Sequence, residues 1–383
     1  MKHLGFLLHC YQPPWQNKYT LNRMHRKCYN PLFEWILSEP EVPITLNINF
    51  SLIELLHIHG HSKTIESIRK LADSGHVDFT GSGAYHPILP LIPPSECERQ
   101  IRLNEEGFRR IVGIDLPKIG FFPPEMACDE KTAAIVKNSG YLWLIMDDQS
   151  FVYRHGYAPF NFIPSANGLP VILRSSYWSN NLAFKKINTV HGFYDALQTN
   201  LGKWFGRSDG YAVIALDGET FGGHENTGDY LNFLKRLCEM LNKKNGIRLA
   251  TISQIIDCFP AKEIAIPSGS WSTSQEDAAR GIYYPLWKHP ENGLHQALWE
   301  LISILLSHMK GNTIANRDLM DKALNSCQFW WLTPDHWNPA NAFRTIPMYQ
   351  DIICQLDLSG DEHEKIKKIF KTLESGTGLR ITT

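Results

Sequence analysis

The sequence lacks the features that mark several classes of protein. Lys and Arg (38 residues) nearly balance Asp and Glu (39), for a formal net charge of −1. There is no basic excess to bind a polyanion, so we expect no nucleic-acid partner. No apolar stretch approaches the roughly 20 residues of a membrane-spanning helix, so we expect no membrane partner. The eight cysteines are scattered without a CxxC pair, which favours buried thiols over disulfides or zinc ligands.

The N-terminus also lacks the pattern of a targeting signal. The segment MKHLGFLLHCYQPP has a short apolar run, but not the longer run and small-residue cleavage site of a signal peptide. We interpret it as a first strand and expect a soluble, cytoplasmic protein. We expect no metal and no other cofactor, and the sequence leaves the oligomeric state open.

The first two thirds of the chain alternates short apolar runs with helical patterns, which predicts a parallel α/β sheet with right-handed crossovers. Seven strands would suit a closed or nearly closed barrel, with an open doubly wound sheet as the alternative. Ser51 with Glu54, and Ser95 with Glu98, have the spacing of helix capping boxes. The predicted strands are His3–Leu8, Pro43–Ile48, His76–Phe79, Lys118–Phe122, Tyr141–Met146, Pro170–Arg174 and Tyr211–Leu216.

The pattern changes after Cys258. The segment PAKEIAIPSGSWSTSQED is rich in Pro, Ser and Gly and predicts a long loop, as suited to a wall of an active site as to a flexible linker. Helices and no strand are expected beyond it. We therefore predict a barrel-like domain over 1–262 and a helical domain over 263–383. The apolar residues that predict its helices are Leu294, Ala297, Leu298, Leu301 and Leu305, then Ile366, Ile369, Phe370 and Leu373.

Two carboxylates directly follow predicted strands: Glu125 in IGFFPPEMA and Asp217 in YAVIALDGETFGGH. The carboxyl ends of parallel strands meet at one rim, where α/β folds place their chemistry. Either acid alone could be a turn cap or a first-turn acid at a helix. Further polar residues also lie at or shortly after the ends of predicted strands, and a whole set of this kind is harder to explain by capping alone. These residues are His9, Gln12, Tyr85, His86, Asp147, Asp148, Glu219 and His224.

Aromatic residues in loops are the second signal. Sugars present flat apolar faces that stack on indole rings, although most tryptophans serve core packing. Trp299, on an apolar helix face, is expected in the core. The candidates for stacking, with a nearby carboxylate, are Trp15, Trp271, Trp330, Trp331 and Asp335.

These segments, in order, resemble the motifs of glycoside hydrolase family 57. The family pattern HxHQP is similar to HCYQP at 9–13, with Tyr11 where the family usually has a second His. The second family motif is similar to GSGAYHPILPLIP, which contains His86, and the third is similar to FFPPE, which ends at Glu125. The pattern DxExFG matches Asp217 to Gly222 at every defined position, and SCQFWW resembles the last motif.

The resemblance implies a (β/α)7 barrel followed by a helical domain that completes the substrate cleft. It implies a retaining α-glycosidase acting on an α-glucan or maltooligosaccharide, with Glu125 as nucleophile and Asp217 as acid/base. We expect burial and the charges of Glu125 and Glu219 to raise the pKa of Asp217. The implied substrate-binding residues are His9, Gln12, Trp15, His86, Glu219, His224, Trp271, Trp330, Trp331 and Asp335.

Amylase-like hydrolysis is favoured over 4-α-glucanotransferase or branching activity, because the chain is short for the latter. Two other classes stay open. A metal-dependent carbohydrate deacetylase could use the HxxxH spacing from His57 to His61, which also includes His59. A non-catalytic glucan-binding protein would use the aromatics and leave the acids idle.

Overall fold

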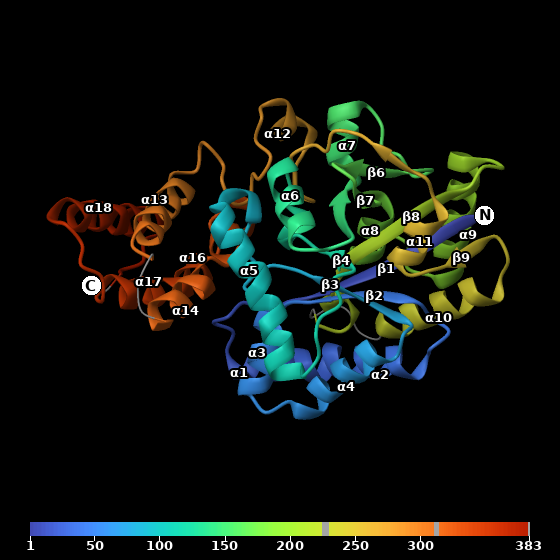
Figure 1. Cartoon of the computed structure of the whole chain (residues 1–383), viewed down its shortest axis with the longest axis horizontal. Coiled ribbons are helices and arrows are strands. Elements are labelled where there is room, and N and C mark those ends of the chain that lie inside the picture. The colour runs from blue at the N-terminus through green and yellow to red at the C-terminus, as the bar shows by residue number, and fades with distance from the viewer. Residues whose placement is uncertain (224–229, 310–313, 382–383) are drawn as a thin grey trace.

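The computed structural model describes residues 1–223, 230–309 and 314–381. Its centre is a parallel sheet in the order β8-β1-β2-β3-β4-β5-β7, with helices packed around it (Figure 1). All seven predicted strands are present, so the barrel-like α/β prediction is confirmed. Their bounds are β1 Lys2–Cys10, β2 Ile44–Ile48, β3 Val77–Gly81, β4 Gly120–Phe121, β5 Trp143–Asp147, β7 Leu169–Arg174 and β8 Gly210–Asp217.

The ends of this sheet meet between β7 and β8. The backbone N–H of Ser175 donates to the carbonyl of Val213 at 2.8 Å. The guanidinium of Arg174 donates to the carbonyl of Ala215 at 2.9 Å. These bonds bring the last two strands together, so the seven strands form a nearly closed ring.

The strands are buried on both faces, which explains why they read as continuous apolar runs. Successive side chains point to opposite faces. In β1, Leu7 belongs to an apolar cluster that also contains Val213 and Ala215 of β8. Phe6 and Leu8 instead belong to the cluster made with the surrounding helices.

The helices around the ring follow the strands in the chain and alternate with them, as predicted. The bounds of these helices are α1 Lys18–Met24, α2 Asn30–Ser38, α3 Phe50–Ile58, α4 Ser62–Asp73, α5 Pro94–Gly107, α6 Glu130–Asn138, α7 Asp148–His155, α8 Ser176–Ala183, α9 Val190–Phe205, α10 Tyr230–Lys243 and α11 Ile252–Cys258, with π-helices η1 His25–Tyr29 and η3 Phe108–Val112. Among the described residues, no helix combines the length and apolar character needed to cross a membrane.

Both predicted capping boxes are wrong. Helix α3 begins at Phe50, and Asn49 is its N-cap, accepting from the Ser51 N–H at 3.2 Å. Helix α5 begins at Pro94, whose missing N–H and fixed φ suit a first helical position. Ser51 and Ser95 therefore lie inside the first turn, where their hydroxyls do not cap.

Three short strands were not predicted: β6 (Ile163–Ala166), β9 (Ile247–Leu249) and β10 (Ala261–Glu263). Strand β6 pairs antiparallel with β7, and β10 pairs with β6. The segment predicted as a long loop therefore begins with a short strand, and the described residues beyond that segment form helices and no strand, as expected. All three side chains of β10 are exposed, so no apolar pattern could reveal it.

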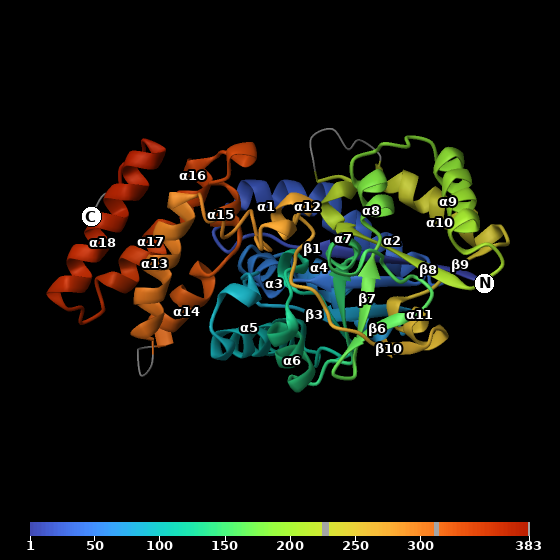
Figure 2. The ribbon, with the colours of Figure 1, turned by 90° about the horizontal axis from the view of Figure 1, so that it is seen from above.

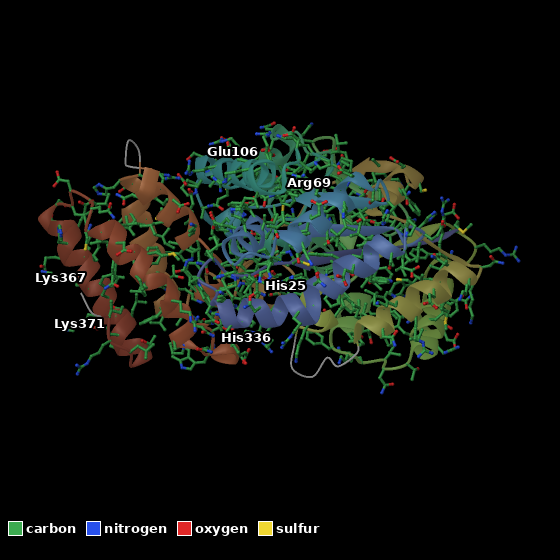
Figure 3. The ribbon with its side chains drawn as sticks, turned by 90° about the horizontal axis from the view of Figure 1, so that it is seen from below. His25, Arg69, Glu106, His336, Lys367 and Lys371 are labelled. Carbon is green, nitrogen blue, oxygen red and sulfur yellow. The ribbon has the colours of Figure 1, made fainter. Side chains whose placement is uncertain are left out.

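The C-terminal helices lie at the end of the molecule opposite the N-terminus (Figure 2). The two predicted apolar stripes lie on α13 and α18, in one apolar cluster with the strand residues Leu144 and Val171. Figure 3 shows Lys367 and Lys371 of α18 far from the barrel. The elements are α12 Gln275–Ala279, α13 Gly293–Ser307, α14 Ile314–Ala323, α15 Cys327–Trp330, α16 Pro339–Ala342, α17 Ile346–Ile353 and α18 Gly360–Thr377, with 3-10 turns η6 Pro334–His336 and η7 Phe343–Thr345.

The division into domains 1–262 and 263–383 stays a prediction. The boundary falls within β10, and the apolar cluster shared by strands and C-terminal helices runs across it.

Candidate active site

One cavity of about 730 Å³ lies past the carboxyl ends of the strands. Cavities of about 760 and 770 Å³ occur elsewhere, so the choice among them rests on the chemistry of the lining. Of these three, the first alone gathers the residues predicted from separate motifs. Those that line it are His9, Gln12, His86, Glu125, Asp217, Glu219, Trp271, Trp330 and Trp331.

Glu125 has an unusual backbone conformation. It sits in the 3-10 turn η4 (Pro124–Met126) after β4, with φ 58° and ψ 18°. Left-handed angles are uncommon for residues other than glycine. His86 (φ 60°) and Met126 (φ 49°) share this feature. Such strain persists only where the surroundings enforce it, and it clusters at functional sites.

The segment around Trp271 enforces the position of Glu125. The Trp271 N–H donates to the Glu125 carbonyl at 3.2 Å, and Cys128 and Gly269 exchange two backbone hydrogen bonds. The Trp271 Nε1–H donates to Oε2 of Glu125 at 2.8 Å. The Pro/Ser/Gly-rich loop is therefore a wall of the cavity rather than a flexible linker.

Asp217 ends strand β8, opposite His9 in the register with β1. The 3-10 turn η5 (Gly218–Phe221) follows and holds Glu219, which is buried. The Tyr29 hydroxyl donates to Glu219, and so does the Tyr11 N–H at 3.1 Å. Glu219 thus ties the first and fourth motifs together.

Burial raises the pKa of all three carboxyls in the cavity. It raises the pKa of Glu125 and of Glu219 to about 8, with the negative charge of Asp217 as the second cause for each. Burial also raises the pKa of Asp217, to about 6, and Arg174 opposes that shift. The pKa of Asp217 is raised by burial, as predicted, but the predicted contribution from the charges of Glu125 and Glu219 is absent: the charge of Asp217 instead raises the pKa of those two groups.

Arg174 was missed by the sequence analysis. It lies at the end of β7, buried, with its guanidinium 2.6 Å from an Asp147 oxygen. It also donates to Oδ1 of Asn180 at 2.8 Å and lies 5.7 Å from the centre of the Trp271 ring. The signal was present, because Arg174 is the last residue of a predicted strand and Asp217 directly follows one.

The imidazoles of His9 and His86 are held in neutral form. Burial lowers the pKa of His9 to about 4 and the pKa of His86 as well. Nδ1 of His9 lies 2.7 Å from Oδ1 of Asn47, an acceptor, so His9 donates from Nδ1 and Nε2 has a lone pair. Nδ1 of His86 lies 2.9 Å from Oγ of Ser326.

The His86 Nε2 is buried and has no hydrogen-bond partner among the described residues. A buried polar atom normally has one, so this nitrogen is an unsatisfied polar atom in a side chain that lines the cavity. Tyr11 stacks on the His86 ring with centroids 4.1 Å apart, and His86 stacks on His9 at 5.0 Å. The Tyr11 ring thus packs against the imidazole while its hydroxyl contacts Cys327 Sγ at 3.6 Å.

The helical region supplies another wall. The Ser326 N–H donates to the His86 carbonyl at 3.1 Å, and the Ser326 hydroxyl lies 3.3 Å from Oε1 of Glu125. Helix α15 then carries Trp330, which stacks on His336 at 4.1 Å. His336, which also lines the cavity, is labelled in Figure 3 near the junction of the two parts.

Three predicted binding residues are not placed in the cavity. Trp15 does not line it, and its ring lies under the guanidinium of Arg344, 5.3 Å away. Asp335 is exposed in η6 and does not line it either. His224 lies outside the described residues. The sequence pattern shows which loops reach the rim but not which side of each loop a residue occupies.

The HxxxH spacing does not contribute to the cavity. His57 is exposed near the end of α3. His61 stacks on His25 at 4.0 Å and bonds Asn22, and His25 lies among the outer helices (Figure 3). In the described ranges, no group of three or more His, Cys, Asp or Glu side chains is arranged to hold a metal ion.

The chain is similar to known proteins in both sequence and structure. A model of glycosyl hydrolase family 57 matches residues 8–267. An alpha-amylase of Pyrococcus horikoshii is 23% identical over 287 residues, covering 71% of this chain and 43% of that protein. The chain thus spans less than half the length of this curated relative.

Two solved structures have a similar fold. A 4-alpha-glucanotransferase from Thermococcus litoralis has a TM-score of 0.73 at 17% identity, covering 93% of this chain and 60% of the other. A GH57-type branching enzyme from Pyrococcus horikoshii has a TM-score of 0.69 at 15% identity, covering 98% and 94%. At these identities the likeness shows the fold.

Proposed function

Because the chain belongs to glycosyl hydrolase family 57, we propose that it is a retaining α-glycosidase that hydrolyses α-glucans. The observation that carries the proposal is the pairing of Glu125 and Asp217 in one cavity, from two strands far apart in sequence. Stacking surfaces from Trp271 and Trp330 in the same cavity as these carboxyls suit a ligand with apolar faces and many hydroxyls.

In the proposed first step, a Glu125 oxygen attacks the anomeric carbon and the glycosidic C–O bond breaks. The departing oxygen takes the proton of Asp217. In the second step Asp217 accepts a proton from water, whose oxygen attacks the anomeric carbon and displaces Glu125. Such a pair requires carboxyl groups about 5–5.5 Å apart.

The proposed roles require the cavity's proton on Asp217 and the charge on Glu125. Burial raises the pKa of both groups, and the charge of Asp217 raises that of Glu125 further. Substrate favours the proton on Asp217, because a glycosidic oxygen accepts a hydrogen bond only from protonated Asp217. The Trp271 Nε1–H and the Ser326 hydroxyl favour the carboxylate at Glu125.

The two neutral imidazoles are proposed to bind sugar hydroxyls. Nε2 of His9 can accept a hydrogen bond, and Nε2 of His86 has no protein partner among the described residues. A neutral imidazole near the reacting sugar adds no positive charge to oppose the oxocarbenium-like transition state. Gln12 and Glu219 are proposed to hold the same sugar from the first and fourth motifs.

Transfer to a second glucan is the alternative outcome of the same chemistry. A branching enzyme has this fold, and the chain covers 94% of its length, so length gives no reason to set transfer aside. Hydrolases and transferases of this kind differ in whether water or a sugar reaches the intermediate. Analysis of the products from maltoheptaose separates them: only shorter chains support hydrolysis, and longer chains overturn it.

Glu125→Gln and Asp217→Asn test the assignment directly on a chromogenic α-maltoside. Asp148→Asn is the matched control, a buried carboxyl that follows β5 and does not line the cavity. We expect Glu125→Gln to lose activity by a factor of about 10⁴ or more, and the control to keep it. Azide should rescue Asp217→Asn, because it attacks the intermediate without a base. Full activity of Glu125→Gln would refute the nucleophile role.

A further inference from the structure

A second cavity adjoins the catalytic one. It has a volume of about 540 Å³ and shares Asn180, Trp271 and Ser272 with the larger cavity. Trp271 therefore lies at the boundary between two adjacent cavities. Its Nε1–H is bound to Glu125 on the catalytic side.

Tyr177 is an exposed aromatic residue in this second cavity. Its side chain is 49% exposed, although it lies in the first turn of α8 next to the fully buried Trp178. The Tyr177 ring meets the Trp178 ring edge-on at 5.1 Å and the Trp204 ring at 6.3 Å. Two indoles thus fix the ring while one side stays open to solvent. A fixed, solvent-facing ring is well suited to stacking on a sugar.

Helix α8 connects the two spaces. Phe184, directly after the helix, is 70% exposed and lines the catalytic cavity. Asn180, midway along the helix, lines both cavities. Seven residues of helix separate the two exposed rings by about 10 Å along the axis. The exposed aromatic side chains at the two ends of this short helix thus each line one of the two adjacent cavities.

We propose that the Tyr177 cavity is an outer subsite that binds a glucose unit of the same α-glucan chain, beyond Trp271. The proposal rests on the proposed function for the identity of the ligand. It deepens that function, because the enzyme would prefer long chains over short ones. Polar groups suited to sugar hydroxyls accompany the ring, among them Gln149 and Asn181.

The test compares chain lengths in Tyr177→Ala, Tyr177→Phe and a control. The control is Tyr157→Ala, because Tyr157 is 50% exposed and lines neither cavity. We expect Tyr177→Ala to lower kcat/KM for maltoheptaose about fivefold, the size of one aromatic contact. The kcat/KM for a chromogenic maltoside should stay unchanged. Tyr177→Phe keeps the ring and should behave as wild type, as should the control.

Equal losses on both substrates, or no loss on either, would overturn the subsite while leaving the glycosidase assignment intact. Calorimetric binding of maltoheptaose and maltose to the Glu125→Gln protein provides a readout without turnover. We expect Glu125→Gln to bind maltoheptaose more tightly than maltose, and the double variant with Tyr177→Ala to lose most of that difference. The subsite is refuted if Glu125→Gln shows no gain in affinity with chain length. Binding with this gain, together with a wild type that does not cleave, refutes the proposed function alone.

Discussion

The indole of Trp271 donates a 2.8 Å hydrogen bond to the carboxyl of Glu125, across 146 residues of sequence. The bond joins the long loop before the helical region to the turn after β4. It also explains how a glutamate is held with left-handed backbone angles, because the Trp271 backbone N–H anchors the Glu125 carbonyl as well.

Trp271→Phe should lower kcat. The change removes the Nε1–H donor and keeps most of the ring, so the Glu125 carboxylate loses a charge-assisted hydrogen bond. Such bonds contribute about 1.5–3 kcal/mol, which corresponds to a loss of about 10–100-fold. Steady-state kinetics on a chromogenic maltoside measures it. Trp337→Phe is the control, because Trp337 is 49% exposed and outside the cavity lining, and an equal loss in both would contradict the role of the bond.

Arg174→Met should extend activity to higher pH. Arg174 opposes the burial that raises the pKa of Asp217, so its removal lets that pKa rise further. Asp217 acts as an acid while protonated, so the basic limb of kcat/KM against pH should move upward.

The single variant would leave Asp147 buried without its ion-pair partner, which costs about 3–5 kcal/mol. The double variant Arg174→Met/Asp147→Asn avoids that cost and should show the same shift. Asp147→Asn alone keeps the guanidinium and should not shift the limb upward. A basic limb that stays in place in both Arg174 variants would contradict the account.

Glu219→Gln should stabilise the protein more at pH 8 than at pH 5. The pKa of Glu219 rises in the folded state from 4.5 to about 8, so the folded state binds more protons between these values. Stability contributed by this group is therefore present below pH 4.5 and lost as pH rises toward 8. Gln can still accept from Tyr29 and the Tyr11 N–H. Thermal unfolding at both pH values measures the difference, and an equal Tm change at the two would refute the pKa shift.

Gly222→Ala should destabilise the fold. Gly222 has φ +125°, and a Cβ there would lie 2.1 Å from the Lys27 carbonyl oxygen. The cost should be about 2 kcal/mol or more in the free energy of unfolding. Gly202→Ala is the control, in helix α9, where a Cβ would meet nothing within 4 Å, and should be neutral or stabilising. Urea denaturation measures the free energy of unfolding of both variants. Equal stability of Gly222→Ala and Gly202→Ala would contradict the close approach of residue 222 to the Lys27 carbonyl.

The sequence predicted the seven strands and most of the rim because both depend on local patterns. Asp217 and Arg174 each end a strand, so the rule that found one applies equally to the other. Trp15 and Asp335 do not line the cavity, because their distance from it depends on tertiary packing, with Arg344 over Trp15. The capping boxes failed because Asn49 and Pro94 are better helix starts than the serines beside them. Strand β10 has only exposed side chains, and Tyr177 owes its site to contacts with Trp178 and Trp204, which no short pattern encodes.

The central claim is that Glu125 becomes covalently linked to the sugar. A fluorinated α-glucosyl fluoride slows the second step of a retaining enzyme, so the intermediate accumulates and peptide mass spectrometry can locate it. We predict one added fluoroglucosyl group on the peptide containing Glu125, absent in Glu125→Gln. A label on any other residue, or an active protein that accumulates none, would contradict the assignment.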